Sequence, residues 1–198
     1  QITPSTLKPL IDKGQIEILT REIYRTPFKE LSHTGHAAIL NEEQKTAADR
    51  FIRDYGEGHR DTYLLHGITG SGKTEVYMEL MEYVLKRGQQ VILLIPEIAL
   101  TYQTVMRFYK RFGDQIAIIN SRLSAGERYD QWERAAKGEV SVMIGPRSAL
   151  FTPFQDLGLI IIDEEHEGAY KSETMPRYHA RDVAAERARL CRAALVLG

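Results

Sequence analysis

The sequence is poor in cysteine: Cys191 is the one thiol among 198 residues. A single cysteine excludes a disulfide framework and a zinc cluster formed within this chain. It is typical of a protein in a reducing compartment, so we expect a cytoplasmic location. No apolar run is long enough to span a bilayer and no signal-peptide pattern is found, so we expect no membrane partner.

The sequence also has no excess of charge of either sign, because it contains 26 Lys and Arg residues and 27 Asp and Glu residues, which gives a formal net charge of −1. Such a balance provides no overall attraction to a polyanion, so any nucleic-acid binding has to come from local motifs. The length of 198 residues favours one full domain with a small additional piece. A chain of this length can bury a sizeable core.

The beginning of the chain differs in pattern from the rest. Ser5 or Thr6 can cap a short helix that Gly14 ends, and two strand-like stretches follow at 16–19 and 22–24. One helix and two short strands are too little to form a core of their own. We therefore expect this part to be the end of a separate small domain.

This pattern predicts three segments. Residues 1–24 are the end of the small domain, and residues 25–39 are a linker with scattered polar residues, a proline and a glycine. Residues 40–198 form the main domain. Both ends of the chain have the pattern of a cut, and an apolar strand runs directly into Gly198. We expect an excised fragment of a larger protein.

The main domain contains a phosphate-loop motif. The stretch Gly67–Thr74 matches the pattern G-x-x-x-x-G-K-[ST] at every fixed position. Glycines let successive backbone N–H groups point at a phosphate chain, and the following helix adds its positive end. Lys73 can reach the β and γ phosphates, and the Thr74 hydroxyl can bind Mg²⁺. The alternative is a chance glycine-rich turn. We predict nucleotide binding by Gly67, Thr69, Gly70, Ser71, Gly72, Lys73 and Thr74.

Strands and helices alternate from residue 40 onward. We expect strands at 62–66, 91–95, 116–119, 140–144, 159–162 and 194–196, and helices at 41–55, 71–87, 100–112, 124–137 and 180–190. Asn41 caps the first of these helices, with Ala47, Phe51 and Ile52 facing inward, and the strand at 62–66 is expected to be buried. This order predicts an α/β fold of the phosphate-loop NTPase class, with a mostly parallel sheet and helices on both faces.

A second group of polar residues follows the apolar strand at 159–162, in the run Asp163-Glu164-Glu165-His166. Asp163 can bind the Mg²⁺ that Thr74 also holds, and Glu164 can orient and deprotonate a water. The alternative is a strand followed by a solvated acidic turn. We predict Lys73, Asp163 and Glu164 as the catalytic set. The paired acids favour hydrolysis over transfer to a second substrate.

This acidic run is a DExH-type box, which resembles that of superfamily-two helicases. The resemblance narrows when further stretches are added, namely Gly67–Tyr77, Pro96–Thr101, Arg147–Phe154, Tyr170-Lys171 and Pro176–Asp182. Over residues 40–198 the chain resembles the family of primosomal protein N′ (PriA), the bacterial replication-restart helicases. This resemblance implies a RecA-like first helicase lobe that is truncated at its C-terminal end. It also implies that residues 1–24 are similar to the end of the winged-helix domain that precedes the lobe in that family.

The same resemblance implies roles for individual residues. Gln44 would bind the adenine edge of ATP, although it is otherwise an ordinary exposed helix residue. Contacts to the DNA backbone, which carry no sequence information, are implied for Pro96, Thr101, Ser121, Arg147 and Ser148. Asn120, Arg122 and Pro146 depart from the family's pattern near these contacts.

The loop from Glu167 to Arg181 interleaves aromatic residues with cations, a combination that can stack on bases and hold phosphates. Further DNA contacts are therefore predicted at Tyr170, Lys171, Arg177 and Tyr178. The alternative is a surface loop whose tyrosines pack locally. We expect this loop to lie outside the core and to couple DNA binding to ATP hydrolysis, as the resemblance implies.

The function implied is that of an ATP- and Mg²⁺-dependent 3′→5′ DNA helicase or translocase at stalled or abandoned replication forks. Its implied partners are single-stranded and branched DNA, other primosome proteins and single-stranded-DNA-binding protein. A second lobe would carry an arginine finger and a zinc insertion, so zinc is expected only outside this chain. Two alternatives stay open: a nucleotide- and DNA-binding module with negligible turnover, and another phosphate-loop enzyme such as a nucleotide kinase.

Overall fold

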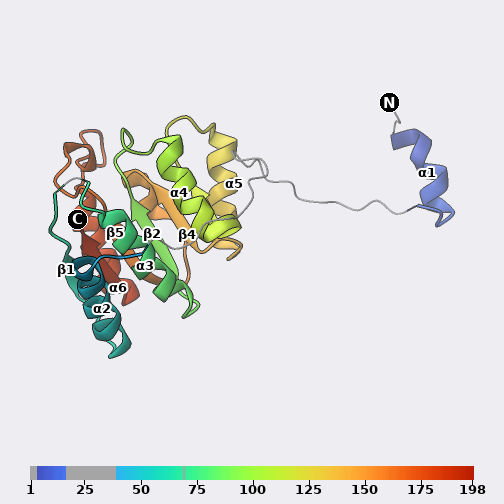
Figure 1. Ribbon diagram of the computed structural model, residues 1–198. Helices are drawn as coiled ribbons and strands as arrows, with labels where there is room; N and C mark the ends of the chain where they lie inside the picture. The colour runs from blue at the N-terminus through green and yellow to red at the C-terminus, as the bar shows by residue number, and fades with distance from the viewer. Residues whose placement is uncertain (1–3, 17–38, 69) are drawn as a thin grey trace.

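The computed structural model describes residues 4–16, 39–68 and 70–198 (Figure 1). Its core is one six-stranded sheet in the order β1-β6-β5-β2-β4-β3, and every neighbouring pair is parallel. The strands are β1 (Thr62–Leu64), β2 (Gln90–Leu94), β3 (Ile116–Ile118), β4 (Val142–Gly145), β5 (Leu157–Ile162) and β6 (Ala194–Leu197). The predicted α/β class with a parallel sheet is confirmed.

Helices alternate with these strands along the chain. They are α1 (Pro4–Asp12), α2 (Glu42–Gly56), α3 (Lys73–Leu85), α4 (Tyr102–Phe112), α5 (Ala125–Ala136) and α6 (Ala180–Cys191). Three short 3₁₀ turns join them in the described part of the chain, η1 (Gly113–Gln115), η2 (Arg147–Phe151) and η3 (Gly168–Tyr170). None of the described helices has the length and apolar character needed to cross a membrane.

The sheet is covered on both faces, because strand side chains alternate between two core clusters. In β2, Val91 and Leu93 pack on one face while Ile92 and Leu94 pack on the other. Helices α2, α3 and α4 supply the first cluster, and α5, η2 and α6 supply the second (Figure 1). Strands that are buried on both faces have continuous apolar sequences, which is why these strands could be predicted from the sequence.

Several helix starts follow directly from local side-chain chemistry. Asn41 and Ser124 each form a reciprocal capping box, with Gln44 and Glu127 respectively, as their spacing predicts. Gly72 has a φ of 86°, so helix α3 begins at Lys73 and not at residue 71 as predicted. The left-handed conformation cannot belong to the helix, and it forms the last part of the phosphate loop instead.

The start of the chain agrees with prediction only in part. Helix α1 ends before Gly14, which has a φ of 65° and donates its N–H to the carbonyl of Ile11. The predicted cap at Ser5 or Thr6 is wrong, because the helix already begins at Pro4, a residue favoured in the first turn. The two strand-like stretches lie outside the described residues from 17 onward.

Predictions about burial at and near α2 are only partly right. Phe51 is fully buried as predicted, together with Ala48 and Tyr55, and Ile52 packs half-buried against the first core cluster. Ala47 is only half-buried. The predicted buried strand at 62–66 is a three-residue edge strand, β1, with exposed residues at both ends. Strand β1 pairs with β6 in parallel, and this pairing brings the phosphate loop that follows β1 to the edge of the sheet where the strands end.

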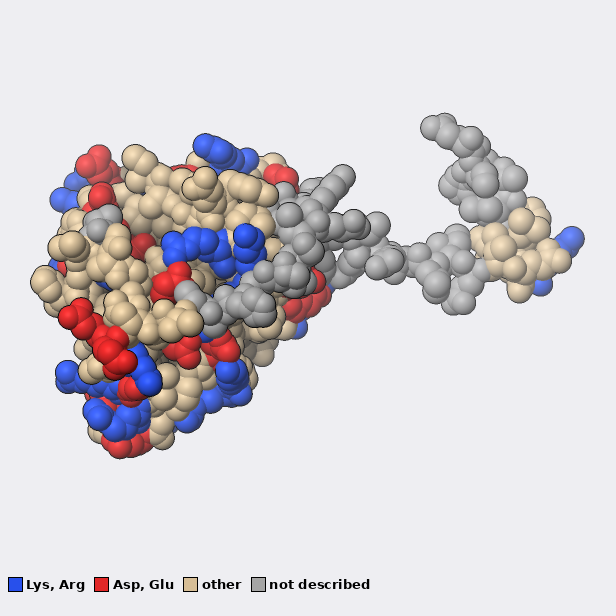
Figure 2. Space-filling view, viewed as in Figure 1, with Lys and Arg blue, Asp and Glu red and all other residues tan. Residues whose placement is uncertain are grey.

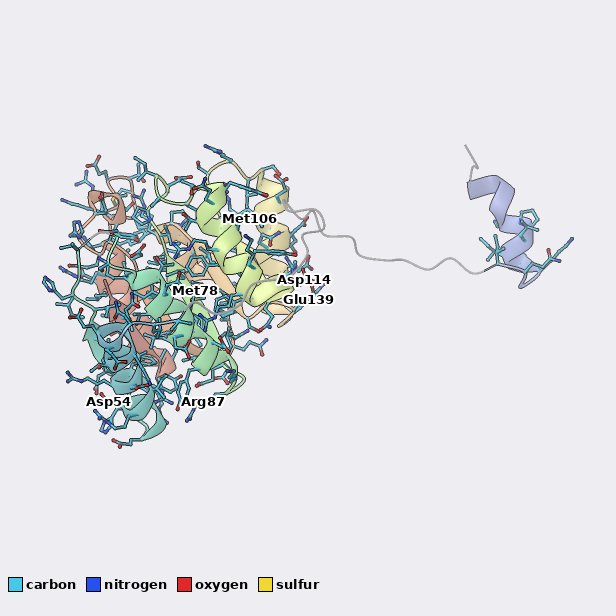
Figure 3. All side chains as sticks on the ribbon, viewed as in Figure 1. Asp54, Met78, Arg87, Met106, Asp114 and Glu139 are labelled. Carbon is cyan, nitrogen blue, oxygen red and sulfur yellow. The ribbon has the colours of Figure 1, made fainter. Side chains whose placement is uncertain are left out.

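The end of the sheet at which the strands begin is held by ion pairs between surface elements. Arg111 of α4 binds Glu79 and Glu82 of α3, and Arg134 of α5 binds Glu139 and the carbonyl of Asp114. Asp114 and Glu139 are labelled in Figure 3. Figure 2 shows cations and acids interspersed over the visible face of this domain, in keeping with the near-neutral net charge.

Candidate functional site

The candidate site lies at the edge of the sheet where the parallel strands end. The phosphate loop follows β1, Pro96 follows β2, Arg147 follows β4 and Asp163 follows β5. Parallel strands deliver their carboxyl ends to one edge, so residues far apart in sequence meet there. This edge has two neighbouring regions, the phosphate loop with its acids and a hollow beside it.

The phosphate loop is shaped by its glycines. Gly70 and Gly72 have φ angles of 84° and 86°, in the region that L side chains rarely adopt. A Cβ on Gly67 would lie 2.7 Å from the Ser71 hydroxyl, so the loop closes too tightly for a side chain there. Thr69 lies outside the described residues. Backbone of this shape is suited to surround a phosphate chain.

Lys73 bridges the loop and the acidic run. Its Nζ donates to the carbonyl of Gly67 at 2.9 Å and lies 3.8 Å from Oε1 of Glu164. The side chain is only 11% exposed, so the cation is held at the bottom of the loop and not in solvent. The structure thus brings together two of the three residues predicted as catalytic.

Glu164 occupies an unusual backbone position, with a φ of 49°. Non-glycine residues adopt this conformation rarely, and such residues are enriched at functional sites. Its other carboxylate oxygen lies 3.7 Å from Nε2 of His166, and its side chain is 21% exposed. The carboxylate therefore faces a cation on one side and is open enough to meet water.

Three atoms of Asp163 form hydrogen bonds within the protein. Its N–H donates to the carbonyl of Leu94 at 2.9 Å, and its own carbonyl accepts from the Tyr170 hydroxyl at 2.7 Å. Its Oδ1 accepts from the Tyr77 hydroxyl at 3.1 Å. Burial raises the pKa of the Asp163 carboxyl above its usual range, and the bond from Tyr77 opposes that rise.

Sequence reasoning missed Tyr77 as part of this site. Its signal was present, because Tyr77 follows Lys73 by four residues and so lies on the same face of α3 one turn later. It was quoted only as part of a motif. Tyr77 is 1% exposed, so its hydroxyl needs the partner that Asp163 provides.

The residues at this edge fit a magnesium ion bound together with a nucleotide. Mg²⁺ is commonly held by one or two protein oxygens plus substrate phosphates and waters. Asp163 supplies a buried carboxylate, and Thr74 lies half-buried in the first turn of α3. The described residues contain no cluster of three or more His, Cys, Asp or Glu side chains that could hold a metal alone.

Gln44 lies against the phosphate loop. Its Nε2 donates to the carbonyl of Ser71 at 3.0 Å, and its Oε1 accepts from the N–H of Asn41 at 3.0 Å. A Cβ on Gly72 would collide with the Gln44 amide. The structure places Gln44 beside the loop with its amide bound to protein backbone on both sides, and its contact to adenine stays a prediction.

A hollow of about 280 Å³ lies at the same edge of the sheet and reaches Tyr170, whose hydroxyl binds the carbonyl of Asp163. It is lined by residues that follow β2, β3, β4 and β5, namely Pro96, Glu97, Ile119, Asn120, Ser121, Arg128, Pro146, Arg147, Ser148, Ala169 and Tyr170. Five of the predicted DNA contacts meet in it: Pro96, Ser121, Arg147, Ser148 and Tyr170. Thr101 does not line it, and accepts from the N–H of Thr104 as the cap of α4.

Two internal contacts fix the shape of the hollow. The carboxylate of Glu97 accepts from the N–H of Ser121 at 2.7 Å, and hydrogen bonds from Ser121 hold the pKa of Glu97 below its usual range. On the opposite side, Arg147 donates to the carbonyls of Ala169 at 2.8 Å and Lys171 at 3.1 Å. Arg147 thereby fastens the loop that follows the acidic run.

The prediction that this loop lies outside the core is wrong for Tyr170. The ring of Tyr170 is 1% exposed and belongs to the second core cluster, so it cannot stack on a base as placed. Burial, with the charge of Asp163 close by, raises the pKa of its hydroxyl. The aromatic pattern did not distinguish a packing tyrosine from an exposed one.

The other predicted loop contacts lie together. Lys171, Arg177 and Tyr178 line a second hollow of about 600 Å³ with Ser172, Glu173 and His179. Tyr178 is half-buried and packs edge-on against Phe151 at 5.5 Å between ring centroids. Of the loop's two tyrosines, Tyr178 is therefore the one that remains partly accessible.

Comparison with known proteins agrees with this geometry. The family model described as "Type III restriction enzyme, res subunit" matches residues 38–197. The chain is 46% identical over 195 residues to replication restart protein PriA of Bacillus subtilis (strain 168), covering 98% of this chain and 24% of that protein. It is 49% identical over 160 residues to PriA of Chlamydia pneumoniae, covering 80% and 21%.

Solved structures show the same fold. RecG bound to a three-way DNA junction has a TM-score of 0.60 and 21% identity over all of this chain and 23% of that one. The UvsW helicase of Bacteriophage T4 has a TM-score of 0.53 and 19% identity over all of this chain and 60% of that one. These likenesses establish a RecA-like helicase lobe as the fold.

The chain spans about a quarter of the length of the curated relatives named above. The resemblance to replication-restart helicases expected from the motifs is confirmed. The chain therefore belongs to the family described as Type III restriction enzyme, res subunit, and within it is similar to replication restart protein PriA.

Proposed function

We propose that this chain is the ATP-binding lobe of a DNA helicase that acts in replication restart. One observation carries the proposal: Lys73 lies between the carbonyl of Gly67 and the carboxylate of Glu164, in the loop shape that Gly70 and Gly72 impose. A cation at the base of a phosphate-binding loop, facing a partly exposed acid, is the arrangement that nucleotide hydrolysis requires.

In this proposal each residue has one task. Backbone N–H groups of the phosphate loop bind the phosphate chain, and Lys73 leaves Gly67 and Glu164 to neutralise its terminal phosphates. Thr74 and Asp163 would hold Mg²⁺, which supplies charge neutralisation for the departing phosphate when bound. Glu164 orients a water and accepts its proton. The buried position of Asp163 lowers local dielectric screening and strengthens these interactions.

The nucleic-acid part of the proposal rests on the hollow. A hollow lined by Arg147 and the hydroxyl residues Ser121 and Ser148 fits a phosphate of a single DNA strand without reading its bases. The second hollow, with Lys171, Arg177 and Tyr178, adds cations and a partly accessible ring next to it. We place single-stranded and branched fork DNA here, with 3′→5′ movement as in the implied family.

Further parts of the proposal concern the whole protein. Residues 1–24 would complete a winged-helix domain and residues 25–39 would link it to this lobe. A second lobe with an arginine finger and a zinc insertion, other primosome proteins and single-stranded-DNA-binding protein are the proposed partners. The relatives are about four times longer than this chain, which leaves room for these parts.

A second function has its own support. Among the described residues, the charged groups beside the phosphate loop, Lys73, Asp163 and Glu164, belong to one lobe. A one-sided site can bind nucleotide and DNA but lacks the opposing cation, which is typically worth about 10³- to 10⁵-fold in rate. As an isolated lobe the chain would then be a binding module with negligible turnover.

One set of assays tests both functions. ATP hydrolysis is measured with and without single-stranded DNA, for the full-length protein and for this 198-residue chain, together with unwinding of a forked duplex. We expect DNA-stimulated hydrolysis and unwinding by the full-length protein, and nucleotide binding with turnover near background by the lobe. Absence of ATP binding by both proteins would overturn the proposal, and strong DNA-stimulated turnover by the lobe alone would overturn the second function.

A further inference from the structure

Tyr77 contacts Asp163, the residue proposed to bind Mg²⁺. It is on α3, one turn after Lys73, and its ring belongs to the first core cluster with 1% of its surface exposed. Its hydroxyl donates to Oδ1 of Asp163 at 3.1 Å, across a sequence distance of 86 residues. The helix that begins at the phosphate loop is thereby joined to the acid at the end of β5 by a side-chain bond.

The phenol is confined by the end of β6. A Cβ on Gly198 would collide with the Tyr77 hydroxyl, so only a glycine leaves room for it in this arrangement. Gly198 donates its N–H to Ile162 at 3.0 Å and accepts from the N–H of Glu165 at 2.9 Å. Backbone on both sides of Asp163 is therefore tied to the residue that encloses the phenol.

This confinement determines which partner the Tyr77 hydroxyl has. A tyrosine hydroxyl is protonated at neutral pH, so the phenol acts as a donor to the Asp163 carboxylate. A carboxylate has two oxygens with about four acceptor sites, and one bond from a phenol uses only one of them. Acceptor capacity remains for a hard cation while the carboxylate plane is fixed.

We propose that Tyr77 is a positioning residue for the Mg²⁺ site: it holds one oxygen of Asp163 so that the carboxylate faces the phosphate loop before the metal arrives. The inference rests on the proposed function, since it assigns the same site to Mg²⁺ and nucleotide. Preorganised ligands bind more tightly because less ordering is needed on binding, and partners of metal ligands commonly tune affinity in this way.

Tyr170 provides a contrast within the same site. Its hydroxyl donates to the backbone carbonyl of Asp163 and not to the carboxylate. Removing that hydroxyl loosens the main chain, whereas removing the Tyr77 hydroxyl frees the carboxylate itself. The two tyrosines therefore have different expected effects on metal binding.

The test uses the full-length protein and its Tyr77→Phe variant, which keeps the buried ring and removes only the hydroxyl. Binding of a fluorescent non-hydrolysable ATP analogue is titrated over a series of Mg²⁺ concentrations and in the presence of EDTA. We expect the Mg²⁺ concentration for half-maximal binding to rise about three- to tenfold, the usual net worth of one hydrogen bond. Affinity in EDTA should be unchanged.

Tyr83→Phe is the matched control, because Tyr83 lies on the same helix and its hydroxyl accepts from Arg87 at the far end of the sheet. It should leave the Mg²⁺ dependence as in the wild type. Equal loss of affinity with Mg²⁺ and with EDTA in Tyr77→Phe would mean a structural role only, and would overturn the inference. So would a Mg²⁺ dependence identical to that of the wild type.

A double-mutant cycle keeps the inference testable if Tyr77→Phe also lowers stability. In an Asp163→Ala background, adding Tyr77→Phe should change the Mg²⁺ dependence no further, because the carboxylate that Tyr77 holds is already absent. Additive effects would overturn the inference. If the wild-type protein itself fails to bind the nucleotide with Mg²⁺, the proposed function fails first, which separates the two failures.

Discussion

The two regions at the carboxyl edge of the sheet are constructed in different ways. The nucleotide region comes mainly from one continuous stretch, Gly67–Thr74, and its shape is set by left-handed glycines. The hollow beside it is assembled from four separate loops, after β2, β3, β4 and β5. The first is local in sequence, and the second exists only when the sheet has formed.

This difference changes what a single substitution does. In the nucleotide region a side chain such as Lys73 has one charged task, so its loss should affect chemistry directly. In the hollow, Arg147 fastens backbone carbonyls of a neighbouring loop while also lining the cavity. Because several residues line the hollow, the loss of one of them should reduce DNA binding only modestly.

The largest effect should come from Glu164→Gln in the full-length protein. The amide keeps the shape of the carboxylate but cannot accept a proton from water, so hydrolysis should fall about 10²- to 10⁴-fold. Nucleotide affinity should stay within a few-fold of wild type. Turnover and equilibrium binding are measured side by side. Equal loss of turnover and of nucleotide affinity would mean that Glu164 acts in nucleotide binding, as Lys73 does, and not in the hydrolysis step.

Lys73→Ala should lower turnover about 10²- to 10³-fold or more, because the phosphates lose the main protein cation of the loop. Unlike Glu164→Gln, it should also weaken nucleotide binding. The matched control is Lys86→Ala, a side chain at the far end of α3 that pairs with Glu82. Near-normal ATP turnover in the Lys73 variant would contradict the assignment of the phosphate loop.

Tyr170→Ala should act through stability, which sharpens the contrast with the loop's other tyrosine. Truncating a buried aromatic side chain costs about 3 to 5 kcal/mol of unfolding free energy. Tyr178→Ala, at a half-buried position, should cost about 1 kcal/mol and reduce mainly the stimulation of ATP hydrolysis by DNA. Urea denaturation and the ratio of ATPase rates with and without DNA distinguish them. An unchanged unfolding midpoint in Tyr170→Ala would contradict its core position.

Arg147→Ala should have the smallest effect, a several-fold loss of affinity for single-stranded DNA. If Arg147 contacts one phosphate, the slope of log affinity against log salt should become shallower by about 0.7. Arg53→Ala, on the exposed surface of α2, is the control and should leave the slope unchanged. A slope equal to wild type in Arg147→Ala would restrict this residue to fastening the loop at Ala169 and Lys171.

Prediction from sequence succeeded where one stretch of chain contains all the determinants. Asn41 caps α2 as expected, and its capping box and that of Ser124 depend only on residues three positions away. The continuous apolar runs of β2 and β5 identified strands buried on both faces. The order of these elements was enough to predict the class of the sheet.

Prediction failed where a residue's surroundings come from distant parts of the chain. Tyr170 and Tyr178 are similar in sequence context, yet one is buried and bound to Asp163 while the other packs beside Phe151. Tyr77 was passed over because its partner lies 86 residues away. Burial and side-chain partnership of this kind depend on packing between elements, which a local pattern does not contain.

By itself, the sequence determined the phosphate loop, the acidic run and the alternation that places both at one edge of a parallel sheet. These follow from backbone freedom at glycine, from capping and from hydrophobic periodicity, all of which act over a few residues. The tertiary structure decided which side chains meet there: Lys73 with Glu164, Tyr77 with Asp163, and Arg147 with the loop beyond. Those contacts require strand order and burial, which only the folded chain establishes.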